Sequence, residues 1–258
     1  MNKDFYISTE KMTVGYHKVP LIKDIELNVE PGEILTLIGP NGSGKSTILK
    51  SITKQLSLIG GTVFLDKQSM QEMNEQEISR KMSVVMTERI HAELMTCEDV
   101  VSTGRYPYTG RLGILTAHDK EKVRAAMEMV HDCDLAEKDF SAISDGQRQR
   151  ILLARAICQE PEIIVLDEPT SFLDIRHKME FLKILHSMAK NLNKTVIMSL
   201  HEIELAYKIS DKILCVKGDH IEHFGTPKEI FKEDLIKELF ELDDETFRLY
   251  FESIQFHK

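Results

Sequence analysis

Residues 39–47 read Gly39-Pro40-Asn41-Gly42-Ser43-Gly44-Lys45-Ser46-Thr47, which fits the phosphate-binding pattern G-x-x-x-x-G-K-[ST]. Glycines let the backbone curl around an anion with its N–H groups turned inward, and a helix that begins at the loop adds the favourable end of its dipole. Lys45 then reaches the β- and γ-phosphates, and the Ser46 hydroxyl ligates Mg²⁺. The alternative is a glycine-rich turn that binds nothing, but the full pattern should arise by chance in only about one in a hundred chains of this length. We therefore expect a nucleoside triphosphate site.

The composition is that of an ordinary globular chain. Its 258 residues, 42% of them hydrophobic, suffice for one or two compact units with a proper core. The net charge of −9 argues against a nucleic-acid surface, which would be basic, so no nucleic-acid partner is expected. No signal peptide is expected, and no apolar run is long enough to span a bilayer, so work at a membrane would need a membrane partner. Scattered cysteines without a C-x-x-C pair favour ordinary thiols: Cys97, Cys133, Cys158 and Cys215.

Short β-like runs alternate with helical ones, which predicts an α/β fold with a largely parallel sheet. No strong strand pattern appears over 87–160, so we expect a mainly helical insertion there, followed by more strands and a charged, helix-prone tail from 226. Helices are expected over 46–54, 75–81, 119–131 and 147–158. Strands are expected over 5–14, 21–29, 33–38, 62–65, 83–86, 162–166, 195–199, 212–216 and 220–224.

An apolar run from Ile163 to Leu166 ends in two acids, Asp167 and Glu168. A strand buried on both faces has this composition, and ligands in open α/β sheets gather at the carboxyl ends of strands. We therefore expect Asp167 beside the phosphate loop, where it holds Mg²⁺ directly or through water. Glu168 can polarise an attacking water as a general base. The alternative is a strand that ends in surface acids, and the phosphate loop upstream favours the catalytic interpretation.

Residues 143–149 read Ile-Ser-Asp-Gly-Gln-Arg-Gln and precede a helical pattern. Ser144, followed three residues later by Gln147, has the form of a capping box that begins a helix. A capped helix N-terminus with the free backbone of Gly146 is also an anion site. The residues by themselves leave both interpretations open.

The phosphate loop, the S-x-G-Q-x-Q helix start and L-D-E-P-T at 166–170 together resemble an ATP-binding-cassette ATPase. Phosphate loops occur in kinases, GTPases and helicases too, whereas the S-x-G-Q-x-Q element does not. The resemblance covers almost the whole chain and implies a P-loop NTPase (RecA-like) α/β core with an N-terminal antiparallel β subdomain and an inserted α-helical subdomain. The expected division of this single domain is a core at 1–86 and 160–225, a helical subdomain at 87–159 and a helical tail at 226–258.

The resemblance also implies roles for single residues. Tyr16 matches the aromatic residue that stacks on adenine; the alternative is a core tyrosine at a strand end. His201 follows a strand and matches the switch histidine, which orients water and the γ-phosphate as part of the catalytic group. A second subunit would supply residues that contact the γ-phosphate or cross the dimer interface: Ser144, Gly146, Gln147 and Asp174.

Two positions depart from the family pattern. Asp145 replaces the first glycine of S-G-G-Q, as in some importer subfamilies, and its carboxylate must point away from phosphate or be offset by Arg148 or Arg150. Thr87 stands where the family has a glutamine that touches Mg²⁺ and relays motion to the membrane subunit. We expect Thr87 to serve as the metal contact, with Glu88 as the alternative.

Three functions fit such an ATPase: the separate subunit of an importer, the motor of an exporter, and a soluble cassette protein acting on DNA or ribosomes. The long insertions or second cassette typical of soluble members are not evident in the sequence. The segment from Asp99 to Tyr108 resembles ATPases that serve iron–siderophore, haem and cobalamin uptake, as do 168–174 and 224–227. Its Tyr106 and Tyr108 either line a groove for a membrane-subunit helix or lie in an exposed turn.

The importer interpretation implies a set of cofactors and partners. ATP and Mg²⁺ are the expected cofactors. A homodimer of ATPase subunits, integral membrane permease subunits and, indirectly, a substrate-binding protein are the expected partners. The expected location is the cytoplasmic face of the cell membrane, as a peripheral protein. A ferric siderophore is the first expectation for the cargo, with cobalamin and haem next.

Overall fold

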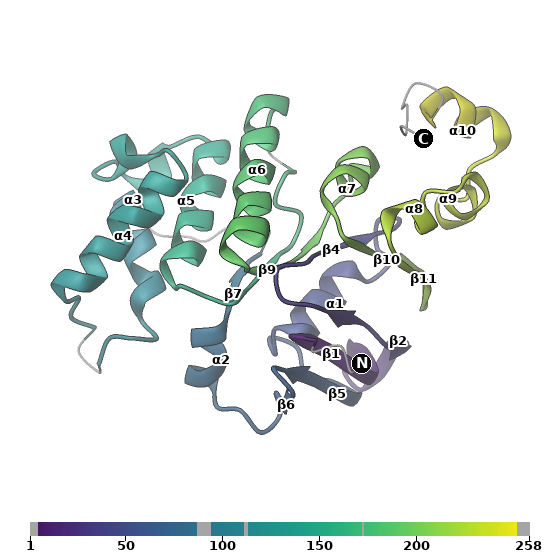
Figure 1. Ribbon diagram of the computed structural model, residues 1–258, viewed down its shortest axis with the longest axis horizontal. Coiled ribbons are helices and arrows are strands. Elements are labelled where there is room, and N and C mark those ends of the chain that lie inside the picture. The colour runs from purple at the N-terminus through teal and green to yellow at the C-terminus, as the bar shows by residue number, and fades with distance from the viewer. Residues whose placement is uncertain (1–4, 87–93, 111–112, 172, 252–258) are drawn as a thin grey trace.

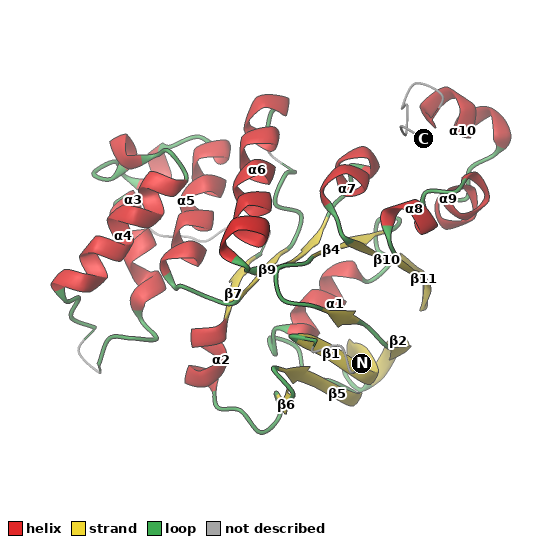
Figure 2. Ribbon diagram, in the orientation of Figure 1, coloured by secondary structure: helices red, strands yellow, loops and turns green. Residues whose placement is uncertain are grey.

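The computed structural model describes residues 5–86, 94–110, 113–171 and 173–251 (Figures 1 and 2). Within them, the larger sheet has the strand order β11-β10-β4-β9-β8-β7, in which β11 alone runs antiparallel to its neighbour. This sheet is the core of the α/β fold that the alternating pattern predicts. Its strands are β4 (Ile34–Ile38), β7 (Met82–Val85), β8 (Ile163–Leu166), β9 (Thr195–Ser199), β10 (Lys212–Lys217) and β11 (His220–Gly225).

The central strands of this sheet are buried along their whole length, which explains their continuous apolar sequences. One face packs on α1 (Lys45–Ile52), whose buried Ile48 and Leu49 share a core with Leu35 of β4. The other face packs on α6 (Ile175–Leu192) and α7 (Ile203–Ile209), where Phe181 belongs to the same core as strand residues such as Ile164. Alternate residues of each strand therefore face different layers, as the two-residue period of a strand requires.

A second, antiparallel sheet lies across α1 and gives the N-terminal part its β character (Figure 2). Its strand order is β2-β1-β5-β6, with β3 also paired to β1. The members are β1 (Ile7–Tyr16), β2 (Val19–Ile25), β3 (Asn28–Val29), β5 (Gly60–Leu65) and β6 (Gln68–Ser69).

Helices gather at one end of the larger sheet and a helical tail extends at the other (Figure 1). In the helical part, capping boxes begin α3, α4 and α5, so their starts are fixed by local hydrogen bonds. This part contains α3 (Cys97–Ser102), η1 (Thr103–Arg105), α4 (Ala117–Met129), η2 (Cys133–Leu135), η3 (Phe140–Ala142) and α5 (Asp145–Cys158). The remaining helices are α2 (Glu75–Lys81) beside β7 and, in the tail, α8 (Pro227–Ile230), α9 (Glu233–Phe240) and α10 (Asp244–Phe251).

The structure differs from the expected strands near the N-terminus. The first strand continues through Tyr16, because the turn consists only of His17 and Lys18, both with positive φ, as in a two-residue hairpin. The strand expected over 21–29 is interrupted after Ile25, and its last residues pair separately with β1 as β3. The strand expected over 62–65 begins two residues earlier, at Gly60, as β5.

A buried ion pair within the helical part provides a stability test. Arg150 Nε and Nη2 donate to the Asp132 carboxylate at 2.7 and 2.9 Å, and both residues are buried. We expect Asp132→Asn to lower the free energy of unfolding by about 3 kcal/mol, because it leaves a buried charge without its counter-ion. Chemical denaturation measures the change.

The matched control is Glu128→Gln, which breaks the solvent-exposed pair between Glu128 and Arg124. Such exposed pairs contribute less than about 1 kcal/mol. Equal losses from the two substitutions would contradict the assignment of the Arg150–Asp132 pair as a buried stabilising contact.

Candidate nucleotide-binding and hydrolysis site

The phosphate loop connects β4 to α1 and adopts a conformation that requires glycine. Gly39, Gly42 and Gly44 have φ of 148°, 77° and 98°, which side chains disfavour. A Cβ at Gly39 would lie 2.0 Å from the carbonyl oxygen of Val216, so no side chain fits between the loop and β10. The glycines thus permit both the curl of the loop and its close approach to the sheet.

The start of α1 is open to an anion. Its N-cap is Gly44, which offers no side-chain cap, and the first turn carries no acidic residue. The Ser43 hydroxyl is buried without a hydrogen-bond partner, and a buried polar atom of this kind is costly unless a ligand or water satisfies it. Free N–H groups, the positive end of the helix dipole and an unpartnered hydroxyl are the features that a triphosphate fits.

Lys45 lies inside the loop rather than in solvent. Its Nζ donates to the carbonyl oxygens of Gly39 and Pro40, each at 2.9 Å, and the residue is 4% exposed. Burial lowers the pKa of Lys45, while the charges of Glu168 and Asp167 oppose that change. The ammonium group is therefore held within the loop, where it can also reach the β- and γ-phosphates of a bound nucleotide.

The two acids after β8 are ordered by one serine. Ser199, the last residue of β9, donates its hydroxyl to Asp167 Oδ1 at 2.7 Å, and Ser199 Oγ accepts the Glu168 backbone N–H at 2.8 Å. Asp167 is 4% exposed, so its carboxylate is directed by these contacts rather than by solvent. The sequence motifs predict no role for Ser199. The parallel pairing of β8 and β9 aligns Leu166 with Met198 and so brings Asp167 and Ser199 together.

Glu168 and His201 lie side by side. His201 Nε2 is 2.6 Å from Glu168 Oε1, and the Ser171 hydroxyl donates to Glu168 Oε2 at 3.3 Å. The backbone of Glu168 has φ of 47°, a conformation that non-glycine residues adopt rarely and that occurs often at functional sites. The sequence predicts these two residues at one site, and the structure brings them together.

Lys45, Glu168 and His201 border one cleft of about 440 Å³. Tyr16 stands at its rim, 46% exposed, and its hydroxyl lies 3.2 Å from Thr47 Oγ1, so a ring face remains available for a planar group. Leu21 also borders the cleft, although no sequence motif indicates a role for it. The lining residues are Tyr16, Leu21, Asn41, Gly42, Gly44, Lys45, Ser46, Thr47, Glu168 and His201.

Eight expected site residues that the structure describes lie outside this lining. Four of them are within two residues of a lining residue in the sequence: Gly39, Pro40, Ser43 and Asp167. The other four are Ser144, Gly146, Gln147 and Asp174. The backbone N–H of Ser144 donates to Gln147 Oε1, and its hydroxyl accepts the Gln147 N–H, so within one chain they form the capping box of α5, next to Gly146. Asp174 caps α6 and contacts the ring of His177 at 2.8 Å. Among the described residues of a single chain, the S-x-G-Q-x-Q element at 144–149, here called the signature segment, therefore does not share a cleft with the phosphate loop.

The carboxylate at position 145 is compensated locally. Asp145 Oδ1 lies 3.0 Å from Arg148 Nη1, whereas Arg150, the other candidate, pairs with Asp132. Thr87 and Glu88, the expected metal contact and its alternative, lie outside the described residues.

Known proteins similar to this chain are ATP-binding proteins, in agreement with a nucleotide site at this cleft. The family described as ABC transporter matches residues 22–171. An uncharacterized ABC transporter ATP-binding protein of Methanocaldococcus jannaschii is 41% identical over 92% of this chain and 81% of that protein. The iron(3+)-hydroxamate import ATP-binding protein FhuC of Bacillus subtilis is 33% identical over 93% of this chain and 89% of that protein.

Solved structures extend the similarity to the fold. An ABC transporter assigned to the metal-chelate type, in an inward-facing conformation, matches with a TM-score of 0.82 and 27% identity over 92% of this chain and 90% of that one. A dimeric bacterial ABC transporter cassette matches in fold, with a TM-score of 0.76 at 24% identity over 86% of this chain and 98% of that one. The chain therefore belongs to the ABC transporter family, as an ATP-binding subunit with ATPase activity.

Proposed function

We propose that the chain is the ATPase subunit of an importer that takes up an iron complex through separate membrane subunits. The observation that carries the proposal is similarity over more than nine-tenths of the chain to import ATP-binding proteins named for iron(3+)-hydroxamate and petrobactin. The match to a metal-chelate type transporter structure supports the same class of cargo. A ferric siderophore is the favoured cargo, with haem and cobalamin as alternatives.

Hydrolysis follows from the residues of the cleft. The free N–H groups of α1 and the Ser43 hydroxyl bind phosphate oxygens, and Lys45 shares its donors between the loop carbonyls and the β- and γ-phosphates. Ser46 and the buried Asp167 offer the oxygen ligands that Mg²⁺ prefers. Bound there, Mg²⁺ would neutralise negative charge on the phosphate oxygens.

The attacking water needs a base and an orienting group. Glu168 borders the cleft with its carboxylate held by His201 and Ser171, so it can accept the proton of a water aligned with the γ-phosphate. His201 fixes the position of that carboxylate and lies on the same side of the cleft. We assign Glu168 as general base and His201 as the group that orients water and phosphate.

We further propose that a second copy of the chain completes the site. Within one chain the Ser144–Gln147 capping box and Asp174 lie outside the cleft, so their contacts with nucleotide require a head-to-tail partner. The start of α5 is an anion-binding end in which Arg148 offsets the charge of Asp145. Tyr16 supplies the stacking face for adenine.

Membrane attachment depends on a permease partner in this proposal. Of the helices in the described ranges, none combines the length and apolar character that crossing a bilayer needs. A second cleft, of about 760 Å³, lies beside the C-terminal half of α5 and is bordered by Met86, Arg155 and Gln159. We propose that a permease helix docks there, at the cytoplasmic face of the membrane, with the 62% exposed ring of Tyr106 nearby. A substrate-binding protein would act through the permease.

The general base can be tested by Glu168→Gln. We expect steady-state ATP turnover to fall about 10²–10⁴-fold, the range for loss of a general base, with ATP affinity retained because the phosphate loop is unchanged. Phosphate release and equilibrium nucleotide binding measure the two quantities. The matched control is Glu162→Gln. Glu162 directly precedes β8, at the end of the strand away from Glu168, so this change should leave turnover unchanged. Normal turnover in Glu168→Gln would remove Glu168 from this role.

The import function can be tested by uptake in the native host. Cells that lack this chain should lose uptake of radio-iron supplied as a ferric hydroxamate, and the wild-type chain, but not Glu168→Gln, should restore it. Labelled haem and cobalamin, supplied in parallel, distinguish the three cargo classes. Full uptake of all three compounds without the chain would contradict the import proposal and favour the exporter or soluble alternatives.

A further inference from the structure

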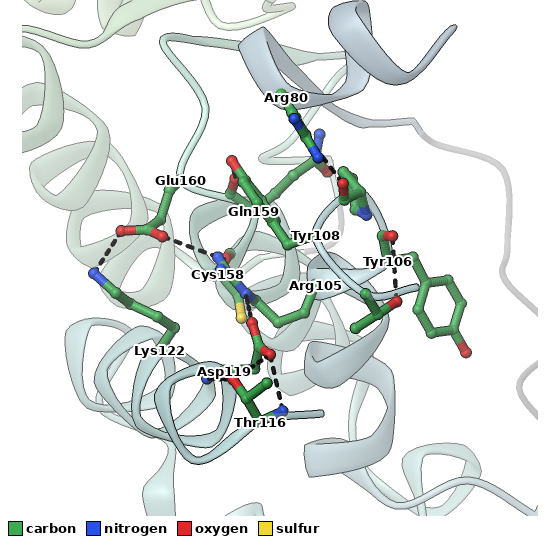
Figure 3. Close-up of polar contacts among 12 residues, drawn as sticks. Arg80, Arg105, Tyr106, Tyr108, Thr116, Asp119, Lys122, Cys158, Gln159 and Glu160 are labelled. Carbon is green, nitrogen blue, oxygen red and sulfur yellow. Dashed lines mark hydrogen bonds and ion pairs between the residues drawn. The ribbon is translucent and has the colours of Figure 1, made fainter. Parts of the chain in front are cut away.

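Arg105 is a buried cation far along the chain from the residues of the nucleotide cleft, and it lies where several segments meet (Figure 3). It is 2% exposed. Its Nε lies 3.0 Å from Asp119 Oδ1, and its Nη1 donates to the carbonyl oxygen of Cys158, the last residue of α5, at 2.7 Å. The same Nη1 lies 3.0 Å from Glu160 Oε2. One guanidinium thus joins η1, the start of α4, the end of α5 and the connection that follows α5.

The charges around Arg105 are fully matched. Asp119 Oδ2 accepts the N–H and hydroxyl of Thr116, which hold the pKa of Asp119 at about 2, with Arg105 acting in the same direction. Burial favours a higher pKa for Glu160, but Lys122 and Arg105 lower it overall. The three acceptors, from Asp119, Cys158 and Glu160, suit the planar guanidinium group, whose N–H donors point in fixed directions. The ammonium group of a lysine cannot reproduce that geometry.

The segment 103–109 packs against the helical part through residues on both sides of Arg105 in the sequence. A Cβ at Gly104 would lie 2.4 Å from the carbonyl oxygen of Arg155, so the loop touches α5 directly. The Tyr108 ring lies 4.1 Å from the Arg105 guanidinium, close enough for a cation–π contact. The Tyr108 hydroxyl donates to the carbonyl oxygen of Gln159 at 3.0 Å.

The same segment is also attached to the core. Arg80, in α2, donates to the carbonyl oxygen of Pro107 at 3.1 Å. The ring of Tyr106, in contrast, points away from this cluster (Figure 3) and is 62% exposed. The segment 103–109 therefore exposes the ring of Tyr106 to solvent. Its other contacts join it both to the helical part and to α2 of the core.

The connection of Gln159 and Glu160 determines the relative position of two functional elements. Gln159 Nε2 donates to the carbonyl oxygen of Met82 at 2.8 Å, at the start of β7, and also to that of Ser79. Glu160 has φ of 53°, a conformation that non-glycine residues rarely adopt without support. The helix before this connection, α5, is capped by Ser144, and the strand after it, β8, ends at Leu166, directly before Asp167.

We propose that Arg105 is a positioning residue that couples the exposed loop 103–109 to the α5–β8 connection, so that contact of a membrane partner with the loop controls ATP turnover. A displacement of the loop moves Arg105, and Arg105 moves the end of α5 and Glu160 together because it binds both. The signature end of α5 and the acids after β8 then shift relative to each other. This inference rests on the proposed function, since it requires a permease partner.

The test compares ATP turnover of the isolated chain with that of the complex purified with its permease and reconstituted in vesicles. Arg105→Lys keeps the positive charge but not the planar guanidinium, and Glu160→Gln removes the charge of Glu160 that pairs with Arg105 and with Lys122. We expect both variants to keep the basal turnover of the isolated chain. The factor by which the permease raises that turnover should fall about fivefold or more, which is the low end of common coupling factors. Asp132→Asn is the control. It breaks the buried ion pair between Arg150 of α5 and Asp132, and it should keep stimulation by the permease.

The outcomes separate coupling from folding and from function. Full stimulation in both Arg105→Lys and Glu160→Gln would overturn the coupling role. An equal loss in Asp132→Asn would overturn it too, because general loosening of the helical part would then explain the effect. A wild-type complex that shows no stimulation by its permease would overturn the proposed function itself, and with it this inference.

Discussion

The register of three parallel strands is the constraint on which the site depends. Hydrogen bonding aligns Leu37 of β4 with Ser199 of β9, and Met198 with Leu166 of β8. The chain therefore leaves all three strands at one edge, where the phosphate loop, the Ser199 hydroxyl and the pair of acids meet. A one-residue slip would turn these side chains to the opposite face, so the buried apolar sequences that hold the register also position the chemistry.

Much of this arrangement could be predicted from the sequence because its causes are local. Four glycine and lysine positions define the phosphate loop, and an apolar run followed by Asp167 and Glu168 defines the neighbouring strand end. The helix expected over 75–81 and the strand expected over 195–199 are confirmed residue for residue, since a capping box and continuous burial mark them clearly. The ATPase family follows from these motifs together with the signature segment.

Other features depend on contacts between segments distant in the chain, and these were not predictable. The break after Ile25 arises from pairing with β1, and α3 is too short to show a helical period. The role of Ser199 appears only once β9 lies beside β8. Arg105 is an unremarkable charged residue in the sequence, yet its acceptors come from α4, from α5 and from Glu160. Tertiary structure alone brings these together.

One measurement tests the central claim, that this ATPase works on a membrane transporter, most directly. The tagged Glu168→Gln variant, expected to retain ATP, can be purified from the membranes of the native host in the presence of ATP, and the co-purifying proteins identified by mass spectrometry. A polytopic permease, with or without a substrate-binding protein, is the predicted result. A soluble complex of DNA-binding or ribosomal proteins without any permease would contradict the transporter assignment, while the hydrolytic site would remain as described.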